Sequence, residues 1–383
     1  MRVDRMLATF LGAHVSTVHK ARVVAVFAAV AALVRGGEIA LSRLGRAIAI
    51  RTTAKHGIKR IDRLYGNGHV LNERQFFYRG IAHGVLRDRP RPAVLVDWTE
   101  VGGGMRVLAA AAPCSGRAVI IYAEVHPLRH YANPRVEARF LRRLAEVLPP
   151  ASRPIIVTDA GFRAPWIRQV LNLGWDFVAR VRGRAYVRPA GGAWLRFDKL
   201  YDAARVKAKD LGPCLVTRYQ PYSCRVVVVR KRRRWRAAQR RLALDSRERQ
   251  EVQAAREPWV LATSIQDIDA DGIVATYASR MQIEEAFRDA KSSRFGWAME
   301  AACTARPGRV EVMVLLAALA SLLILMVGIS AEGAGLHRKY QANTISTRRV
   351  LALTTLGRLV LLHELAAAME SWAEFPVPPA LLR

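Results

Sequence analysis

The sequence is poor in negative charge. It holds 31 Asp and Glu residues against 61 Lys and Arg residues in 383, which gives a formal net charge of +30 and a pI near 11.2. The imbalance indicates a polyanionic partner, because Lys and Arg neutralise phosphates and release their counterions. Since 52 of the 61 basic residues are Arg, codon bias can contribute to the excess. The sign of the charge is therefore better evidence than its size.

Cysteine is scarce and dispersed. Cys114, Cys214, Cys224 and Cys303 form no Cys-x-x-Cys pair, which argues against a zinc ribbon and against a disulfide-rich scaffold. With no signal peptide evident, the expected location is a reducing cytoplasm. No internal repeat is evident either, so a solenoid is not expected.

Hydrophobic runs of about 18 residues, the length that a membrane helix needs, are almost absent. The exception covers residues 312–329 and is interrupted by Ser321 and Gly328. Its length would allow a marginal membrane helix, but an apolar helix can equally be buried in the core of a large protein. We expect a core helix behind a sheet, and no membrane as a partner.

Among the residues that are present, the charged pattern near position 280 is the most informative. Tyr277, Arg280, Glu284 and Lys291 stand at offsets of 3, 7 and 14 residues, which predicts one face of a single helix. A carboxylate between cations and a phenol can ligate a metal while its neighbours hold a phosphate. The alternative is a solvated amphipathic helix with ordinary surface charge.

Two aspartates follow short apolar runs that predict buried strands. Asp97 follows residues 93–96, and Asp159 follows residues 155–158. After Asp159, a turn and a helix with Pro165 in its first turn are expected. Each aspartate could instead be a helix cap or a strand-end acid facing water. Together with Glu284, they form an all-oxygen set suited to Mg²⁺ or Mn²⁺.

The pattern of these residues resembles the DDE transposases of bacterial cut-and-paste insertion sequences, specifically the insertion-sequence-four family. That family has a Tyr-(2)-Arg-(3)-Glu-(6)-Lys signature, and this sequence matches its spacing in full. The other segments that carry the resemblance are Val96-Asp97-Trp98, Thr158-Asp159-Ala160-Gly161-Phe162, Glu257-Pro258-Trp259-Val260-Leu261-Ala262-Thr263 and Arg280-Met281-Gln282-Ile283-Glu284-Glu285.

The resemblance implies a DNA transposase. Asp97, Asp159 and Glu284 are then the catalytic residues and the ligands of two Mg²⁺ ions, for which Mn²⁺ can substitute. It further implies hairpin formation at each transposon end, strand transfer to target DNA, a homodimer in the synaptic complex, and host DNA-bending proteins as candidate partners. The alternatives are a catalytically inactive DNA-binding repressor and a structure-specific nuclease of the same fold.

Residues 1–85 are expected to be helical and to bind the terminal inverted repeats. A helix beginning at Thr52 or Thr53 would turn its apolar residues inward and its cations outward, as in a helix-turn-helix. A merely basic helical bundle is the alternative. The candidate DNA-contacting residues of this helix are Lys55, Lys59, Arg60 and Arg63.

The remaining chain predicts an α/β fold. Three apolar runs between residues 93 and 125 indicate a β-meander, followed by helix, strand, helix and strand, which is the order of a ribonuclease-H-like core. The adjacency of the strands that carry Asp97 and Asp159 is implied by the resemblance alone. The predicted divisions are the core at 86–183 and 258–330, a β-rich insertion at 184–257, and a helical C-terminal region at 331–383 that is a candidate for dimerisation.

The insertion and its edges hold further candidates for DNA contact. Arg180 and Arg182 are expected to share one strand face and hold phosphates, unless they are a simple surface pair. Trp259 corresponds to the aromatic residue that captures a flipped base in the family, and its alternative is a core Trp. The basic run from Arg230, which contains Trp235, suits sequence-independent DNA binding or a solvated charge run.

Overall fold

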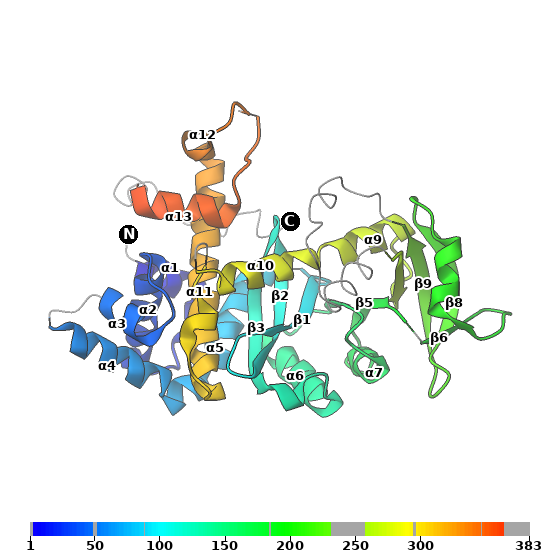
Figure 1. Cartoon of the computed structure of the whole chain (residues 1–383), viewed down its shortest axis with the longest axis horizontal. Coiled ribbons are helices and arrows are strands. Elements are labelled where there is room, and N and C mark those ends of the chain that lie inside the picture. The colour runs from blue at the N-terminus through cyan, green and yellow to red at the C-terminus, as the bar shows by residue number, and fades with distance from the viewer. Residues whose placement is uncertain are drawn as a thin grey trace, which may run out of the picture. The chain divides into compact units, whose positions relative to one another are not determined.

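The computed structural model describes residues 3–48, 52–87, 89–183, 185–230, 257–293, 296–345 and 347–363. The chain divides into two compact units. The first unit comprises residues 1–152 and 281–383, and the second comprises residues 153–280. Most helices and strands of both units are labelled in Figure 1.

The first unit combines three strands with a group of helices. Its strands lie in the order β3-β2-β1, with antiparallel pairing throughout. The strands are β1 (Ala93–Glu100), β2 (Met105–Cys114) and β3 (Arg117–Pro127). The helices before them are α1 (Val3–Leu11), η1 (Gly12–Val15), α2 (Lys20–Val34), α3 (Leu41–Ala47), α4 (Ala54–Tyr65) and α5 (Gly68–Leu86). Those after them are η2 (Leu128–His130), α6 (Pro134–Val147), α10 (Met281–Lys291), η5 (Met299–Ala302), α11 (Pro307–Gly333), α12 (His337–Tyr340) and α13 (Leu353–His363).

The predicted β-meander is confirmed. Gly102, Gly103 and Gly104 all have positive φ and form the turn between β1 and β2, which is a conformation that glycine adopts without a steric penalty. Helix α6 lies where helical periodicity was expected. Asn133 caps its first turn by accepting the N–H groups of Arg135 and Val136.

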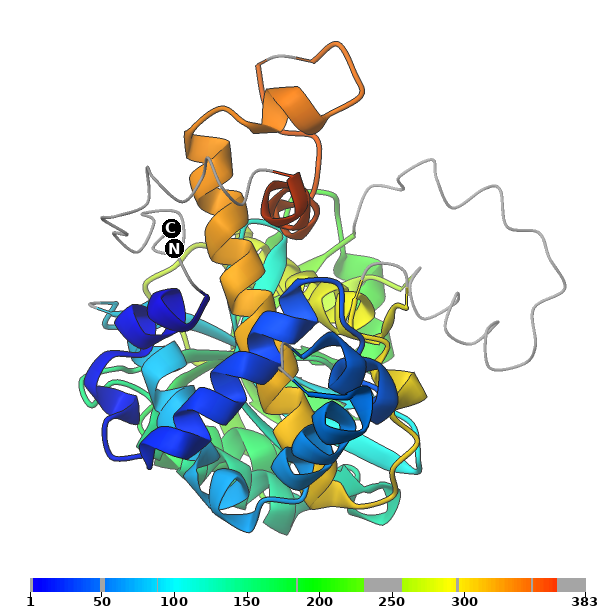
Figure 2. The same ribbon diagram turned by 90° about the vertical axis from the view of Figure 1, so that its left-hand side faces the viewer.

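Helix α11 is the core of the first unit. It is the only described helix long and apolar enough to cross a membrane, but 94% of its most apolar window is buried inside the protein. It packs against α13, β3, α2 and α5, and Figure 2 shows α2 crossing it. The expectation of a buried core helix is thus supported by its packing.

Two glycines allow α11 and α13 to approach closely. A Cβ atom at Gly328 of α11 would lie 2.2 Å from the carbonyl oxygen of Leu353, and one at Gly357 of α13 would lie 2.1 Å from that of Ile324. No side chain fits at either position, so backbone packs against backbone at this crossing.

The second unit is built on seven strands. Its strands lie in the order β4-β5-β10-β9-β8-β6-β7, and only β4 and β5 are parallel. The strands are β4 (Ile155–Thr158), β5 (Asp176–Val181), β6 (Tyr186–Pro189), β7 (Leu195–Arg196), β8 (Lys209–Val216), β9 (Tyr222–Val229) and β10 (Trp259–Thr263). Its helices are α7 (Ala164–Asn172), η3 (Phe197–Ala203) and α9 (Ala270–Ala278).

The strand and helix expected around Asp159 are present. Strand β4 is completely buried, as its unbroken apolar sequence indicated, and α7 follows with Pro165 in its first turn. Strands β6 to β9 lie within residues 185–230, the described part of the segment 184–257 that was expected to be a β-rich insertion. The mixed α/β architecture is compatible with a ribonuclease-H-like fold, and the predicted domain boundaries stay predictions.

Candidate active site and DNA interface

Asp97 lies on β1, which runs four residues beyond the apolar run 93–96. It pairs in register with Ala109 of β2, and its carboxylate accepts the backbone N–H of Trp98 at 2.8 Å. Trp98 points to the opposite face because side chains alternate along a strand. There it donates its indole N–H to buried Glu137 of α6 at 3.2 Å. Helix α6 therefore covers the Trp98 face, and Asp97 lies on the other one.

Helix α10, which carries Glu284, is fixed to the β2–β3 hairpin. The side-chain oxygen of Gln282 accepts the backbone N–H groups of Cys114 at 2.8 Å and Gly116 at 3.2 Å. Further along the helix, Asp289 accepts from Arg117 Nε at 2.7 Å. These contacts hold α10 on the hairpin at two points. The sequence pattern did not predict that Gln282 and Asp289 position this helix.

Glu284 and Lys291 are both half-buried on α10. The helix packs against all three strands of the first unit, including β1 with Asp97. Glu284 and Asp97 thus belong to the same compact unit and to elements in direct contact.

The prediction of one continuous helix from Tyr277 to Lys291 is wrong. Helix α9 ends at Ala278 and α10 begins at Met281. In between, the Ser279 hydroxyl donates to the Thr276 carbonyl at 2.6 Å, and Arg280 N–H donates to the Tyr277 carbonyl at 3.0 Å. Such short-range bonds tighten the chain and interrupt the α-helical ladder. Tyr277 lies on α9 and Arg280 in the turn, so the four signature residues do not share one helix face.

Asp159 stands directly after β4 and shapes the turn that follows. Its Oδ1 accepts the backbone N–H of Gly161 at 2.8 Å, which is a local turn typical of aspartate. A Cβ atom at Gly161 would approach this oxygen to 3.0 Å. The turn therefore holds the carboxylate, which is half-buried, in one orientation.

A cavity of about 330 Å³ lies beside Asp159 within the second unit. It is lined by Asp159, Ala160, Gly161, Arg182, Gly183 and Glu257. The cavity is lined by carboxylates, which repel a phosphate, as well as by a guanidinium group, which attracts one. A phosphate can therefore bind there only if the guanidinium group turns toward the phosphate.

Glu257 joins the two arginines that the sequence singled out. Its Oε2 accepts from Arg182 Nε at 2.9 Å and from the Tyr201 hydroxyl at 3.3 Å, and it lies 3.9 Å from the Arg180 guanidinium. Burial lowers the pKa of Arg180, whose side chain is only 13% exposed. Arg180 is thus not part of a simple surface pair. Glu257 belongs to a segment that carries the family resemblance, but the sequence pattern predicted no role for it.

Trp259 opens β10, as expected, and is buried. Its ring meets that of Tyr277 edge to face. Burial raises the pKa of Tyr277, and the charges of Arg280 and Arg180 only partly oppose this. Tyr277 therefore stays a neutral phenol that can donate a hydrogen bond.

The three candidate metal ligands have suitable chemistry. Asp97, Asp159 and Glu284 offer only carboxylate oxygens, the donors that Mg²⁺ and Mn²⁺ prefer. Within the described residues, no three His, Cys, Asp or Glu side chains gather as a metal-binding group. His126 and His130 are four residues apart, a spacing seen in zinc sites, but the His126 ring hydrogen-bonds to Glu124 at 3.1 Å.

The N-terminal helices α3 and α4 pack as a close pair. A Cβ atom at Gly45 would lie 2.5 Å from Ile58 Cα, so glycine is required at this contact. In α4, Ile61 and Leu64 are buried while the candidate DNA-contacting cations lie on the outer side. The arrangement has the outward basic helix that the sequence predicted.

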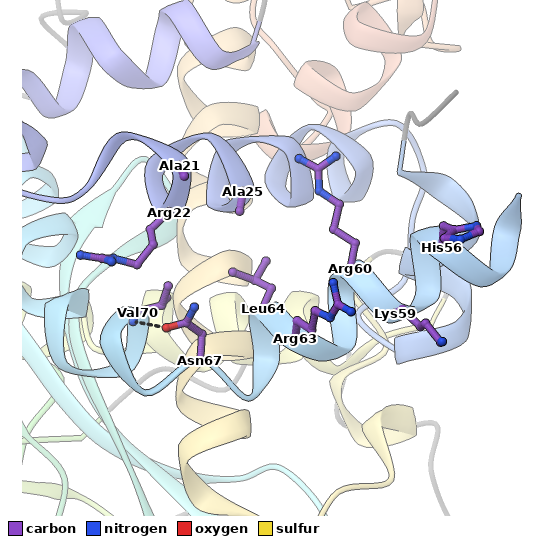
Figure 3. A pocket seen from close by; sticks show the side chains of 10 residues that line it. All are labelled: Ala21, Arg22, Ala25, His56, Lys59, Arg60, Arg63, Leu64, Asn67 and Val70. Atoms are coloured by element: carbon purple, nitrogen blue, oxygen red, sulfur yellow. Dashed lines mark hydrogen bonds between the residues drawn. The ribbon is translucent and has the colours of Figure 1, made fainter. Parts of the chain in front are cut away.

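A pocket of about 470 Å³ lies between α4 and α2. Figure 3 shows Lys59, Arg60 and Arg63 on the α4 side, whereas Lys55 is not among the lining residues. Arg22 of α2 also lines it, but its Nε and Nη2 donate to the Glu73 carboxylate at 2.6 and 2.5 Å. The cations available to an anion in this pocket therefore come mainly from α4. The basic run after Arg230, with Trp235, lies outside the described residues.

Comparison with known families agrees with these features. The model of the transposase DDE domain matches residues 88–323, which is more than half of the chain. No curated protein gives a significant match. The matched region contains β1, which carries Asp97, and α10, which carries Glu284. It also contains β4, which ends directly before Asp159. The chain belongs to the transposase DDE domain family.

Proposed function

We propose that this protein moves a bacterial insertion sequence by cut-and-paste transposition. We place it in the insertion-sequence-four group, where it resembles the transposase of the tetracycline-resistance transposon ten. The observation that carries the proposal is the family match over residues 88–323, which contains Asp97, Asp159 and the whole spaced signature up to Lys291.

The carboxylates of Asp97, Asp159 and Glu284 would hold two Mg²⁺ ions, or Mn²⁺ in their place. The bound ions would supply charge stabilisation and a more acidic water at the scissile phosphate. The other signature residues act on the phosphate itself. The Tyr277 phenol donates a hydrogen bond, and the cations of Arg280 and Lys291 offset the charge of the transition state. Every cleavage is an in-line displacement, so one site serves all steps.

The DNA undergoes four successive phosphoryl-transfer reactions. Water first cuts one strand at the transposon end, and the released 3′-OH attacks the opposite strand to form a hairpin. Water then reopens the hairpin, and the 3′-OH attacks target DNA. Trp259 captures a base flipped out of the bent end, which requires it to leave its packing against Tyr277. Arg180 and Arg182 hold phosphates near Asp159.

The partners follow from this chemistry. Lys55, Lys59, Arg60 and Arg63 of α4 contact the terminal inverted repeats, and two protomers join two ends in a synaptic complex. Host DNA-bending proteins assist, and the protein acts in the cytoplasm at the nucleoid.

The test is cleavage of end-labelled duplex that carries the element's own terminal repeat, in Mg²⁺, on denaturing gels. Glu284→Gln should abolish hairpin and nicked products while leaving end binding intact. Glu285→Gln is the matched control, because this neighbouring carboxylate pairs with exposed Arg288 on the same helix and should not affect cleavage.

The outcomes separate the competing functions. Tight end binding without cleavage in Mg²⁺ or Mn²⁺ would favour a catalytically inactive repressor. Cleavage that needs no terminal repeat and never yields strand transfer would favour a structure-specific nuclease. Cleavage that survives Glu284→Gln would remove this carboxylate from the site.

A further inference from the structure

The β6–β7 edge of the second unit presents arginines and aromatic rings on one face of the strands. Tyr186 and Arg188 are two residues apart on β6 and therefore point to the same side, and Arg196 of β7 pairs in register with Tyr186. Val187 between them points to the other side and is completely buried. We call the outward set, Tyr186, Arg188, Trp194, Arg196 and Arg218, the arginine–aromatic face.

Two of these arginines lie over aromatic rings. The Arg218 guanidinium is 3.9 Å from the centroid of Tyr186, and the Arg188 guanidinium is 5.2 Å from that of Trp194. Both arginines are exposed. A guanidinium that lies over a ring keeps its N–H groups at its edge, and it loses less freedom when these groups bind an anion. Arg196 differs, because it is paired with Asp198 at 2.7 Å.

The turn that presents Arg218 is fixed by its own hydrogen bonds. The Thr217 hydroxyl donates to the carbonyl of Tyr219 at 3.0 Å, and Arg168 of α7 donates to the carbonyl of Gln220. The neighbouring Tyr219 is 84% exposed. The cation is therefore held in place before any ligand arrives, which reduces the entropy cost of binding.

The charge of the surrounding segment indicates the ligand. Residues 185–230 contain nine basic and three acidic residues, and Asp210 among the acids is paired with Arg225. We propose that the arginine–aromatic face binds the phosphodiester backbone of double-stranded DNA without sequence preference. Because arginines already cover the rings, the rings are not free to stack on bases. The face instead presents the N–H edges of its guanidinium groups to phosphates. This inference rests on the proposed DNA substrate but not on the carboxylate site.

The experiment measures binding of the full-length protein to duplex DNA that lacks the terminal repeat, over a range of salt concentrations. The double variant Arg188→Gln and Arg218→Gln should make the slope of log K against log salt shallower by about 2, because each lost phosphate contact removes about 0.9. The control pair is Arg35→Gln and Arg338→Gln, which are exposed arginines of the first unit and should change the slope little.

The ring partner gives an independent readout. Tyr186→Leu should weaken binding as Arg218→Gln does, whereas Tyr186→Phe keeps a ring beneath the guanidinium and should bind as the unaltered protein does. An equal loss in the control pair, or a loss on single-stranded DNA alone, would overturn the proposal. Unchanged DNA binding together with weaker binding to an acidic protein would do so too. Terminal-repeat cleavage at low salt, lost in Glu284→Gln and kept in Arg188→Gln, tests the proposed function separately.

Discussion

The rings of Trp259 and Tyr277 meet edge to face, with centroids 4.6 Å apart and planes at 80°. The contact joins the first residue of β10 to the signature tyrosine of α9. Because the positive edge of one ring faces the negative face of the other, such a pair stabilises the fold beyond the area it buries.

Replacing Trp259 should therefore affect both stability and DNA processing. Trp259→Ala is expected to lower the free energy of unfolding by about 3 kcal/mol, because a buried indole leaves a cavity. Trp259→Phe should retain most of this stability. If Trp259 also captures a flipped base, Trp259→Phe at a temperature where it is fully folded still slows hairpin formation. A normal hairpin rate in that variant would assign Trp259 to the core alone.

Removing Glu257 should destabilise the second unit through the arginines that it pairs. Glu257→Ala leaves the largely buried Arg180 and the half-buried Arg182 without their shared carboxylate, and we expect a loss of about 1 to 2 kcal/mol in urea unfolding. Glu285→Ala is the matched control. Its partner Arg288 is 69% exposed, so the loss should stay below about 0.5 kcal/mol. Equal losses would show that the Glu257 pairs are no stronger than a surface ion pair.

The glycine contact between α13 and α11 can be tested by adding one methyl group. Gly357→Ala would force a Cβ atom to within 2.1 Å of the Ile324 carbonyl oxygen. Separating the helices should cost about 2 kcal/mol or more, seen as a lower thermal midpoint. Gly333→Ala at the end of α11 has no atom within 4 Å and should be neutral or slightly stabilising. A tolerated Gly357→Ala would contradict the close crossing.

Buried Glu124 predicts acid sensitivity of the first unit. Burial alone would raise its pKa, but hydrogen bonds from His126, Tyr122 and Arg143 outweigh this and lower its pKa to about 2. A carboxyl whose pKa is lower in the folded state stabilises the protein above its unfolded pKa, near 4.3, and loses that contribution as the pH falls toward 2.

The expected contribution of this ionisation is about 3 kcal/mol. Unfolding by urea at pH 6, 4 and 3 should show a steeper loss of stability for the unaltered protein than for Glu124→Gln, which cannot ionise. Parallel curves would mean that the ionisation of Glu124 is not coupled to folding.

The local elements followed from the sequence because neighbouring residues determine them. The alternation and apolar runs between residues 93 and 181 predicted five strands and two helices, and each is present within a few residues. The apolar residues of α4 indicated its buried face for the same reason. The three carboxylates could likewise be named from strand ends and signature spacing, although their joint role remains a prediction.

The tertiary structure decided what depends on partners distant in sequence. The spacing of Tyr277 and Glu284 suits one helix, but Ser279 and Arg280 make local bonds that end α9, and Gln282 fastens α10 to a hairpin 168 residues earlier. Glu257 acquired its role only when folding brought Arg182 to it across 75 residues. Periodicity reports which residues lie on one face of an element. Folding determines which distant donor and acceptor come within hydrogen-bonding distance.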